Sequence, residues 1–285
     1  MTGPGVAPPP RPHDGHKHDF GRVGILGGCA GPQVMLGAPV LAGRAALRAG
    51  SGGVVLMVPD RLVQAALALL PEAIGMPLGI ERIIDLSVEA MVVGPGLGPG
   101  GDTSALIQHV LGTIGVPGVV DADGLNAIAT MVDDPWPASR QIILTPHLGE
   151  YARLAERYGL PIAGKGDEGR RNAALALAQR TGTVVVLKGF QTVVASPDDG
   201  VWTCATGGNT LAVPGSGDVL AGLLGSLIAA RARQGEAGVF EAAKLAVHTH
   251  GLAGDRYAAT VARRGMLARE LADQIPAILD MEASA

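Results

Sequence analysis

Six short runs of aliphatic and β-branched residues recur along the chain, and each is cut off by a glycine, a proline or a charged residue. The runs are continuous rather than alternating, which is typical of strands that are buried on both faces of a parallel sheet. Segments with helical spacing separate them, so we predict an α/β fold, a three-layer sandwich with a mostly parallel central sheet and helices on both faces. The runs cover residues 23–26, 54–58, 91–93, 119–121, 142–145 and 184–187.

The remaining segments complete the predicted layout. Residues 192–195 and 201–206 flank a turn at 197–200 and predict a β-hairpin. Residues 71–90 carry mixed signals, and no element is assigned to them. Helices are predicted over residues 37–49, 62–70, 103–111, 125–131, 167–181, 219–228, 239–257 and 266–279, and a further helix opens at 147–150.

The chain has 285 residues and is rich in glycine and aliphatic side chains, which suits one large domain. No internal repeat interrupts it, so we predict a single domain over residues 20–285. Residues 1–19 are rich in proline, glycine and histidine and lack an apolar stretch, so we predict a disordered tail rather than a secretory signal. A metal site at His13, His16 and His18 is the less favoured interpretation of their spacing.

Net charge and cysteine content restrict the partners and the cellular compartment that we predict. The formal net charge of −4 gives no indication of nucleic acid or of an anionic membrane as a partner. Glycine, proline or charge breaks every apolar run before it reaches membrane-spanning length. The two cysteines, Cys29 and Cys204, cannot build a disulfide framework, so we expect a reducing compartment, the cytoplasm. Neither has a Cys or His partner at zinc-ligand spacing.

Polar and glycine-rich residues follow nearly every predicted strand. Because sheets of this kind bind ligands beyond the carboxyl ends of their strands, these segments should meet on one rim. A packing requirement would account for the glycines but not for the charges. The rim set comprises Gly94-Pro95-Gly96, Asp121, Asp123, Thr145-Pro146-His147, Lys188-Gly189 and Gly217-Asp218.

The sequence Pro214-Gly215-Ser216-Gly217-Asp218 opens an apolar helix. A helix start has unpaired N–H groups and partial positive charge, and glycines let the backbone approach an anion, so the turn predicts a phosphate site. Asp218 has two interpretations here, an N-cap of the helix or a general base beside the phosphate. The other charges of the predicted rim favour the base.

Four further polar residues have both a chemical and a structural interpretation. Lys188 can reach a phosphate as a point charge or stand exposed at its strand end. His147 can hold a substrate or cap the following helix. Asp121 and Asp123 can serve a metal or a ribose hydroxyl, although acidic turns with a purely structural role are more common. The glycine loop at 94–98 fits neither the dinucleotide fingerprint nor a Walker motif.

Together these stretches resemble the NAD(P)H-hydrate dehydratases, nucleotide-dependent repair enzymes of the ribokinase-like superfamily. The resemblance extends over nearly the whole chain from residue 20 onward, and the order and combination of its stretches make it specific. The stretches are residues 37–42 with 46–52, 93–98, 120–126, 144–150, and 186–189 followed by the turn at 214–218.

That resemblance implies a ribokinase-like fold and a reaction in two steps. ADP or ATP transfers a phosphoryl group to the C6 hydroxyl of the S-epimer of hydrated NADH or NADPH. Phosphate is then eliminated, which restores the dihydronicotinamide ring. Mg²⁺ would help to neutralise charge in such a transfer. The family also suggests a homotetramer.

The resemblance further implies roles for individual residues. Asp218 matches the family's base at the reacting hydroxyl. The positions that match contacts to hydrated NAD(P)H are Ala38, Gly96, Asp123, Asn126 and His147, together with Asp218. The positions that match contacts to the adenine nucleotide are Lys188, Gly189, Phe190, Gln191, Thr192, Gly215, Ser216 and Gly217. Metal ligands are not assigned.

The chain departs from the family pattern in several places. Pro214 replaces the first glycine of the turn, and because proline has no N–H, we expect weaker or rearranged donor binding if that N–H normally meets the phosphate. Leu148 replaces a common second proline, and residues 208–212 replace the usual stretch before the turn. The epimerase domain that is often fused upstream does not occur in this sequence, so we expect a separate epimerase to act in the same pathway.

Two other function classes fit parts of the sequence. A ribokinase-like small-molecule kinase, similar to hydroxyethylthiazole kinase, would share the Gly-Ser-Gly-Asp turn and leave a stable phosphorylated product. Residues 145–147 and 94–98 fit the dehydratase better. A catalytically inactive nucleotide-sensing protein is supported only by Pro214, whereas Asp218 and Lys188 speak against it.

Overall fold

A sheet of nine strands runs through the middle of the protein in the order β3-β2-β1-β4-β5-β6-β7-β8-β9. This computed structural model describes residues 3–83, 86–99, 101–113, 115–133, 141–164, 166–235 and 238–284. Strands β1 to β7 pair in parallel, and β8 and β9 continue the sheet antiparallel at one edge. The strands are β1 (Arg22–Leu26), β2 (Gly53–Val58), β3 (Ile74–Pro77), β4 (Ala90–Val93), β5 (Gly118–Val120), β6 (Ile142–Leu144), β7 (Val184–Leu187), β8 (Val193–Ser196) and β9 (Gly200–Thr203).

Two hydrophobic cores lie on the two faces of the sheet. In β4, Val92 packs into one core, whereas its neighbours Met91 and Val93 pack into the other. Successive side chains of a strand point to opposite faces, so a strand with no polar side chain must be covered on both sides. The predicted mostly parallel sheet with helices on both faces is therefore confirmed.

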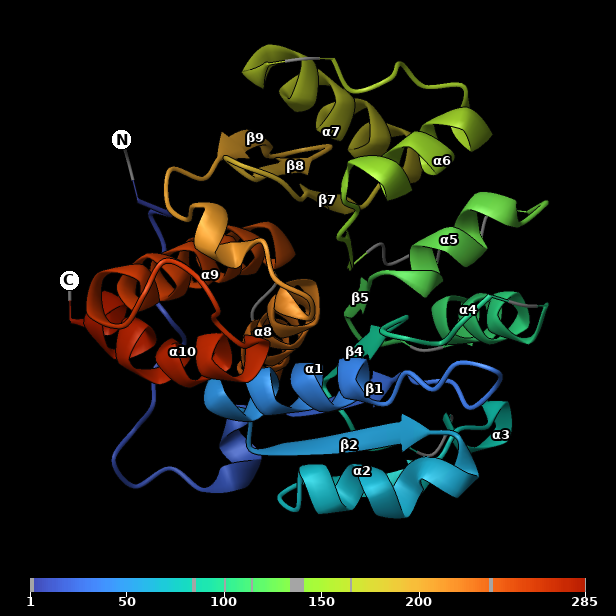
Figure 1. Cartoon of the computed structure of the whole chain (residues 1–285), viewed down its shortest axis with the longest axis vertical. Coiled ribbons are helices and arrows are strands. Elements are labelled where there is room, and N and C mark those ends of the chain that lie inside the picture. The colour runs from blue at the N-terminus through green and yellow to red at the C-terminus, as the bar shows by residue number, and fades with distance from the viewer. Residues whose placement is uncertain are drawn as a thin grey trace.

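The helices form two layers, one on each core. Figure 1 shows α8, α9 and α10 gathered on one side of the sheet and α4, α5 and α6 on the other. The first layer contains α1 (Gly37–Arg48), α2 (Val63–Leu69), α8 (Ser216–Arg233), α9 (Val239–Thr260) and α10 (Ala268–Ala283). The second contains α3 (Ile80–Ile83), α4 (Gly101–Thr113), α5 (Asp123–Thr130), α6 (Leu148–Tyr158) and α7 (Asp167–Thr181). None of the helices in the described ranges is both long and apolar enough to cross a membrane.

Helix α8 packs against both the sheet and α1, and small residues let it approach both. A Cβ at Gly222 would lie 1.9 Å from the carbonyl oxygen of Ala42 in α1, and a Cβ at Gly225 would lie 2.6 Å from a methyl group of Val92 in β4. Any side chain at Gly222 would therefore push the two helices apart. This close packing fixes where the first turn of α8 meets the rim of the sheet.

The segment that the sequence left unassigned, residues 71–90, contains β3 and α3. Strand β3 is an edge strand, and Ile74 is 53% exposed. An edge strand has no continuous buried run, which explains why the hydrophobic pattern did not reveal it.

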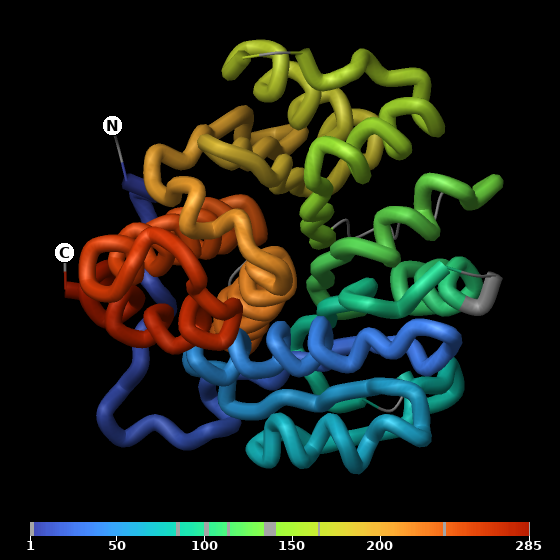
Figure 2. Tube along the Cα trace, viewed as in Figure 1, coloured from blue at the N-terminus to red at the C-terminus, as the bar shows by residue number. Residues whose placement is uncertain are grey.

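The described part of the N-terminal segment runs along the surface beside the C-terminal helices (Figure 2). Arg11 donates from Nη1 to the carbonyl of Gly50 over 2.8 Å, and its guanidinium lies 3.9 Å from the ring centroid of Phe20. A short 3₁₀ helix, Lys17–Phe20, then leads into β1. Disorder of residues 1–19 and the domain limits at 20–285 stay predictions.

Candidate active site

The loops that follow the parallel strands meet at one rim of the sheet. The hydroxyl of Thr145, after β6, donates to Oδ1 of Asp121, after β5, over 2.7 Å. The amide of Lys188, after β7, donates to the carbonyl of Pro146 over 2.8 Å. Gly94, after β4, packs so closely here that a Cβ would lie 1.8 Å from the carbonyl oxygen of Asp121. Four strand ends thus build one surface, as the sequence predicted.

Two carboxylates hold the side chain of Lys188 at this rim. Its Nζ lies 2.6 Å from Oδ1 of Asp121 and 3.8 Å from Oε2 of Glu150, and both carboxylates are buried. Burial works to lower the pKa of Lys188, but Asp121 and Glu150 outweigh it, and the pKa is raised. A Cβ at Gly217 would lie 3.4 Å from Nζ, so this fixed positive charge borders the start of α8. The interpretation of Lys188 as an exposed strand-end lysine is wrong.

His147 is the N-cap of α6. Its Nδ1 accepts hydrogen bonds from the amides of Gly149, over 2.9 Å, and Glu150, over 3.2 Å, and the Glu150 carboxylate accepts from the amide of His147 over 2.7 Å. Burial raises the pKa of Glu150, and Lys188 opposes that rise. The capping role of His147 is therefore confirmed, and its side chain is 55% exposed although its Nε2 also lies 3.4 Å from Oε1 of Glu150.

A tight turn leads into α8. The amide of Ser216 donates to the carbonyl of Val213 over 3.3 Å, and Gly215 has φ 86° and ψ −7°. These angles belong to the third residue of a type II turn, which requires glycine there and favours proline just before it. Pro214 occupies that second position and is exposed. The departure from the family pattern therefore suits the turn that carries it.

Asp218 is the third residue of α8, and the N-cap position belongs to Gly215. The N-cap interpretation of Asp218 is therefore wrong, although an acid in the first turn still suits the helix dipole. Burial and the negative charge of Asp121 raise the pKa of Asp218 to about 7, Lys188 opposes that rise, and Asp123 adds to it. A carboxyl group with a pKa in this range can exchange a proton near neutral pH.

A buried histidine supports the same turn from α9. Nε2 of His250 lies 3.0 Å from the carbonyl oxygen of Ser216 and 3.2 Å from its hydroxyl oxygen. Burial lowers the pKa of His250 to about 4, so the ring is neutral at pH 7. Because a carbonyl only accepts, the Nε2–H donates to it, and this bond ties the start of α8 to α9.

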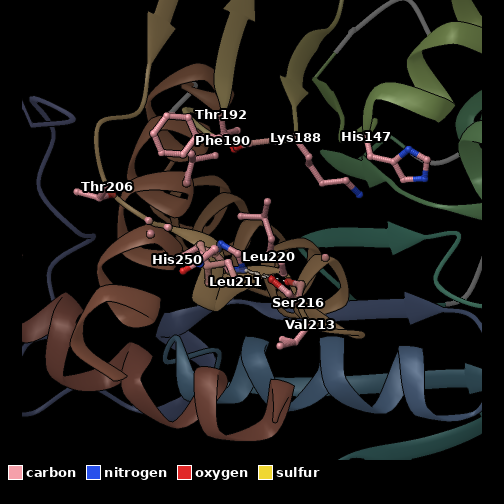
Figure 3. Close-up of a pocket in the computed structure, with 18 residues that line it drawn as sticks. His147, Lys188, Phe190, Thr192, Thr206, Leu211, Val213, Ser216, Leu220 and His250 are labelled. Atoms are coloured by element: carbon pink, nitrogen blue, oxygen red, sulfur yellow. Dashed lines mark hydrogen bonds between the residues drawn. The ribbon is translucent and has the colours of Figure 1, made fainter. Parts of the chain in front are cut away.

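A cavity of about 550 Å³ opens between this turn and the end of β7. Figure 3 shows Lys188 on one side of it and Ser216 with His250 on the other. Of the predicted nucleotide contacts, those that line the cavity are Lys188, Gly189, Phe190, Thr192, Ser216 and Gly217. Gln191 and Gly215 lie outside the lining, and His147, predicted on the substrate side, lies within it.

A second cavity of about 530 Å³ lies along the rim beside α4 and α5. Asp123 and Asn126 line it, and Oδ2 of Asp123 accepts from the amide of Gly98 over 2.8 Å. The other two predicted substrate contacts lie together, because a Cβ at Gly96 would be 3.2 Å from the Cβ of Ala38. Ala38, in the first turn of α1, comes after β1, and Gly96 comes after β4. The strand order reverses between these two strands, which is the usual place for a ligand in such a sheet.

Three candidate site residues were given no role by the sequence, although Asp121 was placed on the predicted rim. Asp121 was considered and set aside as an acidic turn, Glu150 was seen only as part of a helix start, and His250 lies inside an apolar helix. The signal that could have found Glu150 and Asp121 is their position after β6 and β5, which lie one and two strands away from β7, the strand that ends at Lys188. Among the described residues, no group of three or more His, Cys, Asp or Glu is arranged to hold a metal, and both cysteines are free.

The three-layer fold and the glycine-rich rim place the chain in the ribokinase-like class of α/β proteins. The family model for NAD(P)H-hydrate dehydratase matches residues 23–277. The chain therefore belongs to the NAD(P)H-hydrate dehydratase family, which confirms the resemblance drawn from the sequence.

Individual relatives support this assignment. The chain is 34% identical to the ADP-dependent (S)-NAD(P)H-hydrate dehydratase of Xanthomonas campestris, with 98% of each chain covered. It is 38% identical to the bifunctional NAD(P)H-hydrate repair enzyme Nnr of Moorella thermoacetica, with 95% of this chain and 51% of that protein covered. The chain thus spans about half the length of the bifunctional relatives it matches.

A solved structure is similar over nearly its whole length. The crystal structure of the ADP/ATP-dependent NAD(P)H-hydrate dehydratase of Bacillus subtilis, co-crystallised with ATP and Mg²⁺, superposes with a TM-score of 0.81 at 30% identity. The superposition covers 96% of this chain and 94% of that one.

Proposed function

We propose that the protein dehydrates the S-epimer of hydrated NADH or NADPH back to NADH or NADPH, with ADP or ATP as phosphoryl donor. The position of Asp218 carries this proposal. It follows Gly217, which lines the first cavity, and its pKa responds both to Lys188 of that cavity and to Asp123 of the second. A base at this junction can serve a donor in one cavity and an alcohol in the other.

The first cavity suits the phosphates of the donor. The amides at the start of α8 and the positive end of its dipole favour an anion at Ser216 and Gly217. The ammonium of Lys188 adds a positive charge across the cavity from them. Phosphoryl transfer depends mainly on positioning and on charge stabilisation, and these groups would supply both.

In the proposed transfer, Asp218 accepts the proton of the C6 hydroxyl as the hydroxyl oxygen forms a bond to the terminal phosphorus of the donor. The bond between that phosphorus and the bridging oxygen breaks, so ADP would leave AMP and ATP would leave ADP. A pKa of about 7 lets Asp218 be charged before the transfer and protonated after it.

Elimination would follow on the phosphorylated dinucleotide. The C6–O bond breaks and its electron pair leaves with inorganic phosphate. C5 gives its proton to the departing phosphate or to water, and the electron pair of that C–H bond restores the C5–C6 double bond. We propose that Ala38, Gly96, Asp123, Asn126 and His147 hold the dinucleotide during both steps. Gly96 and Ala38 offer a surface without large side chains, which suits a flat ring.

We propose that Mg²⁺ accompanies the donor. Mg²⁺ keeps several waters and is usually bound by one or two carboxylates together with substrate phosphates. Carboxylate oxygens are present at the rim in Asp218 and in Asp123, whose Oδ2 accepts from the amide of Gly98, whereas Lys188 engages Asp121 and Glu150. The rim therefore fits an ion held chiefly by the phosphates, and its chemistry would be charge neutralisation.

Three further proposals concern the setting of the reaction. We propose a homotetramer, as the family suggests, and a cytoplasmic location, which the two free cysteines support. We also propose that a separate epimerase supplies the S-epimer. The bifunctional naming of relatives twice the length of this chain supports that link.

The experiment that tests the function compares phosphoryl donors. Hydrated NADH is incubated with the protein and ADP, ATP or no nucleotide, in the presence of Mg²⁺, and the dihydronicotinamide absorbance is followed. We expect recovery with ADP, as in the relative that matches over 98% of both chains. Recovery with ATP alone would reassign the donor, and no recovery with either nucleotide would overturn the proposal.

A further inference from the structure

We propose that Arg170 of α7 is a positioning residue that holds the segment Lys188–Thr192, the nucleotide loop, in the shape that receives the phosphoryl donor. This inference rests on the proposed function, because it assumes that the first cavity binds ADP or ATP. No sequence motif singled out Arg170, and it does not line the cavity. It is assigned from its contacts with the far side of the loop.

The nucleotide loop is a tight turn that closes on itself. The hydroxyl of Thr192 donates to the carbonyl of Gly189 over 2.9 Å, and the amide of Gly189 approaches the same hydroxyl at 3.4 Å. Gln191 has φ 55°, a left-handed conformation that non-glycine residues seldom adopt. Such a conformation persists only where the surroundings enforce it, so the loop needs support from outside.

Arg170 provides that support at both ends of the turn. Its Nη1 donates to the carbonyl of Phe190, and its Nη2 donates to the carbonyl of Leu187 over 3.3 Å. The guanidinium passes directly under Gly189, where a Cβ would lie 2.8 Å from Nη2. A planar guanidinium can donate to two carbonyls at once, which a lysine ammonium on a flexible stem does less well.

A second contact comes from the first residue of the same helix. With its amide nitrogen turned toward α7, Gln191 donates to Oδ1 of Asp167 over 3.0 Å. Asp167 and Arg170 lie one turn apart on α7, so one helix end holds both the carbonyls and the strained residue of the loop.

These contacts decide what the loop presents to the cavity. The carbonyl oxygens of Leu187 and Phe190 are occupied on the α7 side, which keeps two negative dipoles away from the phosphates. The side chains of Lys188 and Thr192 then line the cavity. Loss of Arg170 would free the carbonyls and let the loop leave this shape, so the donor would have to restore it on binding.

The adjacent residue offers a matched control. Arg171 is also half-buried and also donates from its guanidinium, to Oγ1 of Thr203 over 2.8 Å and to the carbonyl of Val201 over 3.3 Å. Those partners belong to β9, whose residues do not line the cavity. Arg171→Ala therefore removes a similar set of contacts from the same helix without touching the nucleotide loop.

The test measures ADP and ATP binding to the whole protein by calorimetry, without the dinucleotide, for wild type, Arg170→Ala, Arg170→Lys and Arg171→Ala. We expect Arg170→Ala to bind the nucleotide about tenfold more weakly than wild type does, because charged hydrogen bonds to the loop are lost. Arg170→Lys should lose less, and Arg171→Ala should stay within about twofold while its melting temperature falls comparably. In turnover, the KM for the donor should rise while kcat and the KM for the hydrate stay near wild type.

The inference is overturned if folded Arg170→Ala binds nucleotide like wild type, or if Arg171→Ala weakens binding equally. If Arg170→Ala does not fold, Arg170→Lys takes its place in the test. Unchanged nucleotide affinity and an unchanged KM for the donor in Arg170→Lys would then overturn the inference. Nucleotide binding by wild type without recovery of NADH would overturn the proposed function and leave this inference standing. Absence of binding by wild type to both nucleotides would overturn both.

Discussion

The ammonium nitrogen of Lys188 lies 2.6 Å from Oδ1 of Asp121, although the two residues are 67 positions apart in the chain. The pair joins the ends of β7 and β5, and Glu150 approaches the same ammonium at 3.8 Å. Since both carboxylates are buried, the charge of Lys188 is fixed in place before any ligand arrives. Lys188 thus has a structural task and a proposed catalytic one, and the two can be separated by mutation.

Lys188→Met should reduce the free energy of unfolding by about 3–5 kcal/mol, because it leaves the carboxylate of Asp121 buried without its partner. Adding Asp121→Asn should recover part of that stability, since it removes the unpaired charge. The KM for the donor should stay high in both variants, measured by steady-state kinetics beside chemical denaturation. If the KM for the donor returned to the wild-type value in the double variant together with its stability, Lys188 would not contact the nucleotide.

Asp218→Asn should lower kcat by about 10²–10⁴-fold, the usual contribution of a general base. Asparagine keeps the size of the side chain but cannot accept the hydroxyl proton. Calorimetric titration should find nucleotide affinity close to wild type, because the donors to the phosphates are the backbone and Lys188. Turnover near the wild-type rate would remove Asp218 from the role of base.

The pH dependence of kcat/KM should report the same carboxylate. Asp218 must be charged to act as the base. Burial and Asp121 raise its pKa to about 7, so kcat/KM should rise as pH increases through about 7 and then level off. Asp121→Asn should move the midpoint to lower pH, because it removes a neighbouring negative charge. A midpoint that stays in place in this variant would contradict the assignment.

The free energy of unfolding should fall as pH increases, whereas kcat/KM should rise. The pKa of Asp218 is about 7 when folded and 3.8 ordinarily, so between these values the folded protein binds more protons than the unfolded chain. Stability therefore falls as pH rises through this window, and Asp218→Asn removes that loss. The gain in melting temperature of the variant over wild type should be larger at pH 8 than at pH 4.5. A gain independent of pH would argue against the raised pKa.

Pro214→Gly should cost about 0.4–1 kcal/mol of stability through the unfolded chain, because proline suits the second position of a type II turn. Nucleotide affinity should remain within about twofold of wild type, since Pro214 is exposed and does not line the cavity. Denaturant melts and calorimetry with ADP measure the two quantities. A tenfold change in affinity in either direction would mean that residue 214 takes part in phosphate binding.

The sequence located the sheet well because its inner strands are continuous apolar runs, and such a signal is local. It missed β3 because an edge strand is only partly buried, as the exposed Ile74 illustrates. The loops of the rim followed from the rule that ligands bind beyond the carboxyl ends of parallel strands. The family resemblance then added roles that spacing alone did not supply.

The pairings inside the site could not be predicted in the same way. The sequence placed Asp121 and Lys188 on the same rim, but only the fold shows that their side chains pair. His250 sits in an apolar stretch of α9, 34 residues from the serine it supports, and nothing local marks it. Arg170 is one of two successive arginines on an exposed-looking helix, and only the tertiary contacts distinguish it from Arg171.

The central claim is that phosphorylation of the hydrate is followed by elimination. Its most direct test is to measure restored NADH and released inorganic phosphate in the same reaction with hydrated NADH and the active donor. We predict that the two products appear in equal amounts and that Asp218→Asn yields almost none of either. A stable phosphorylated dinucleotide without recovery of NADH would contradict the account and identify a kinase.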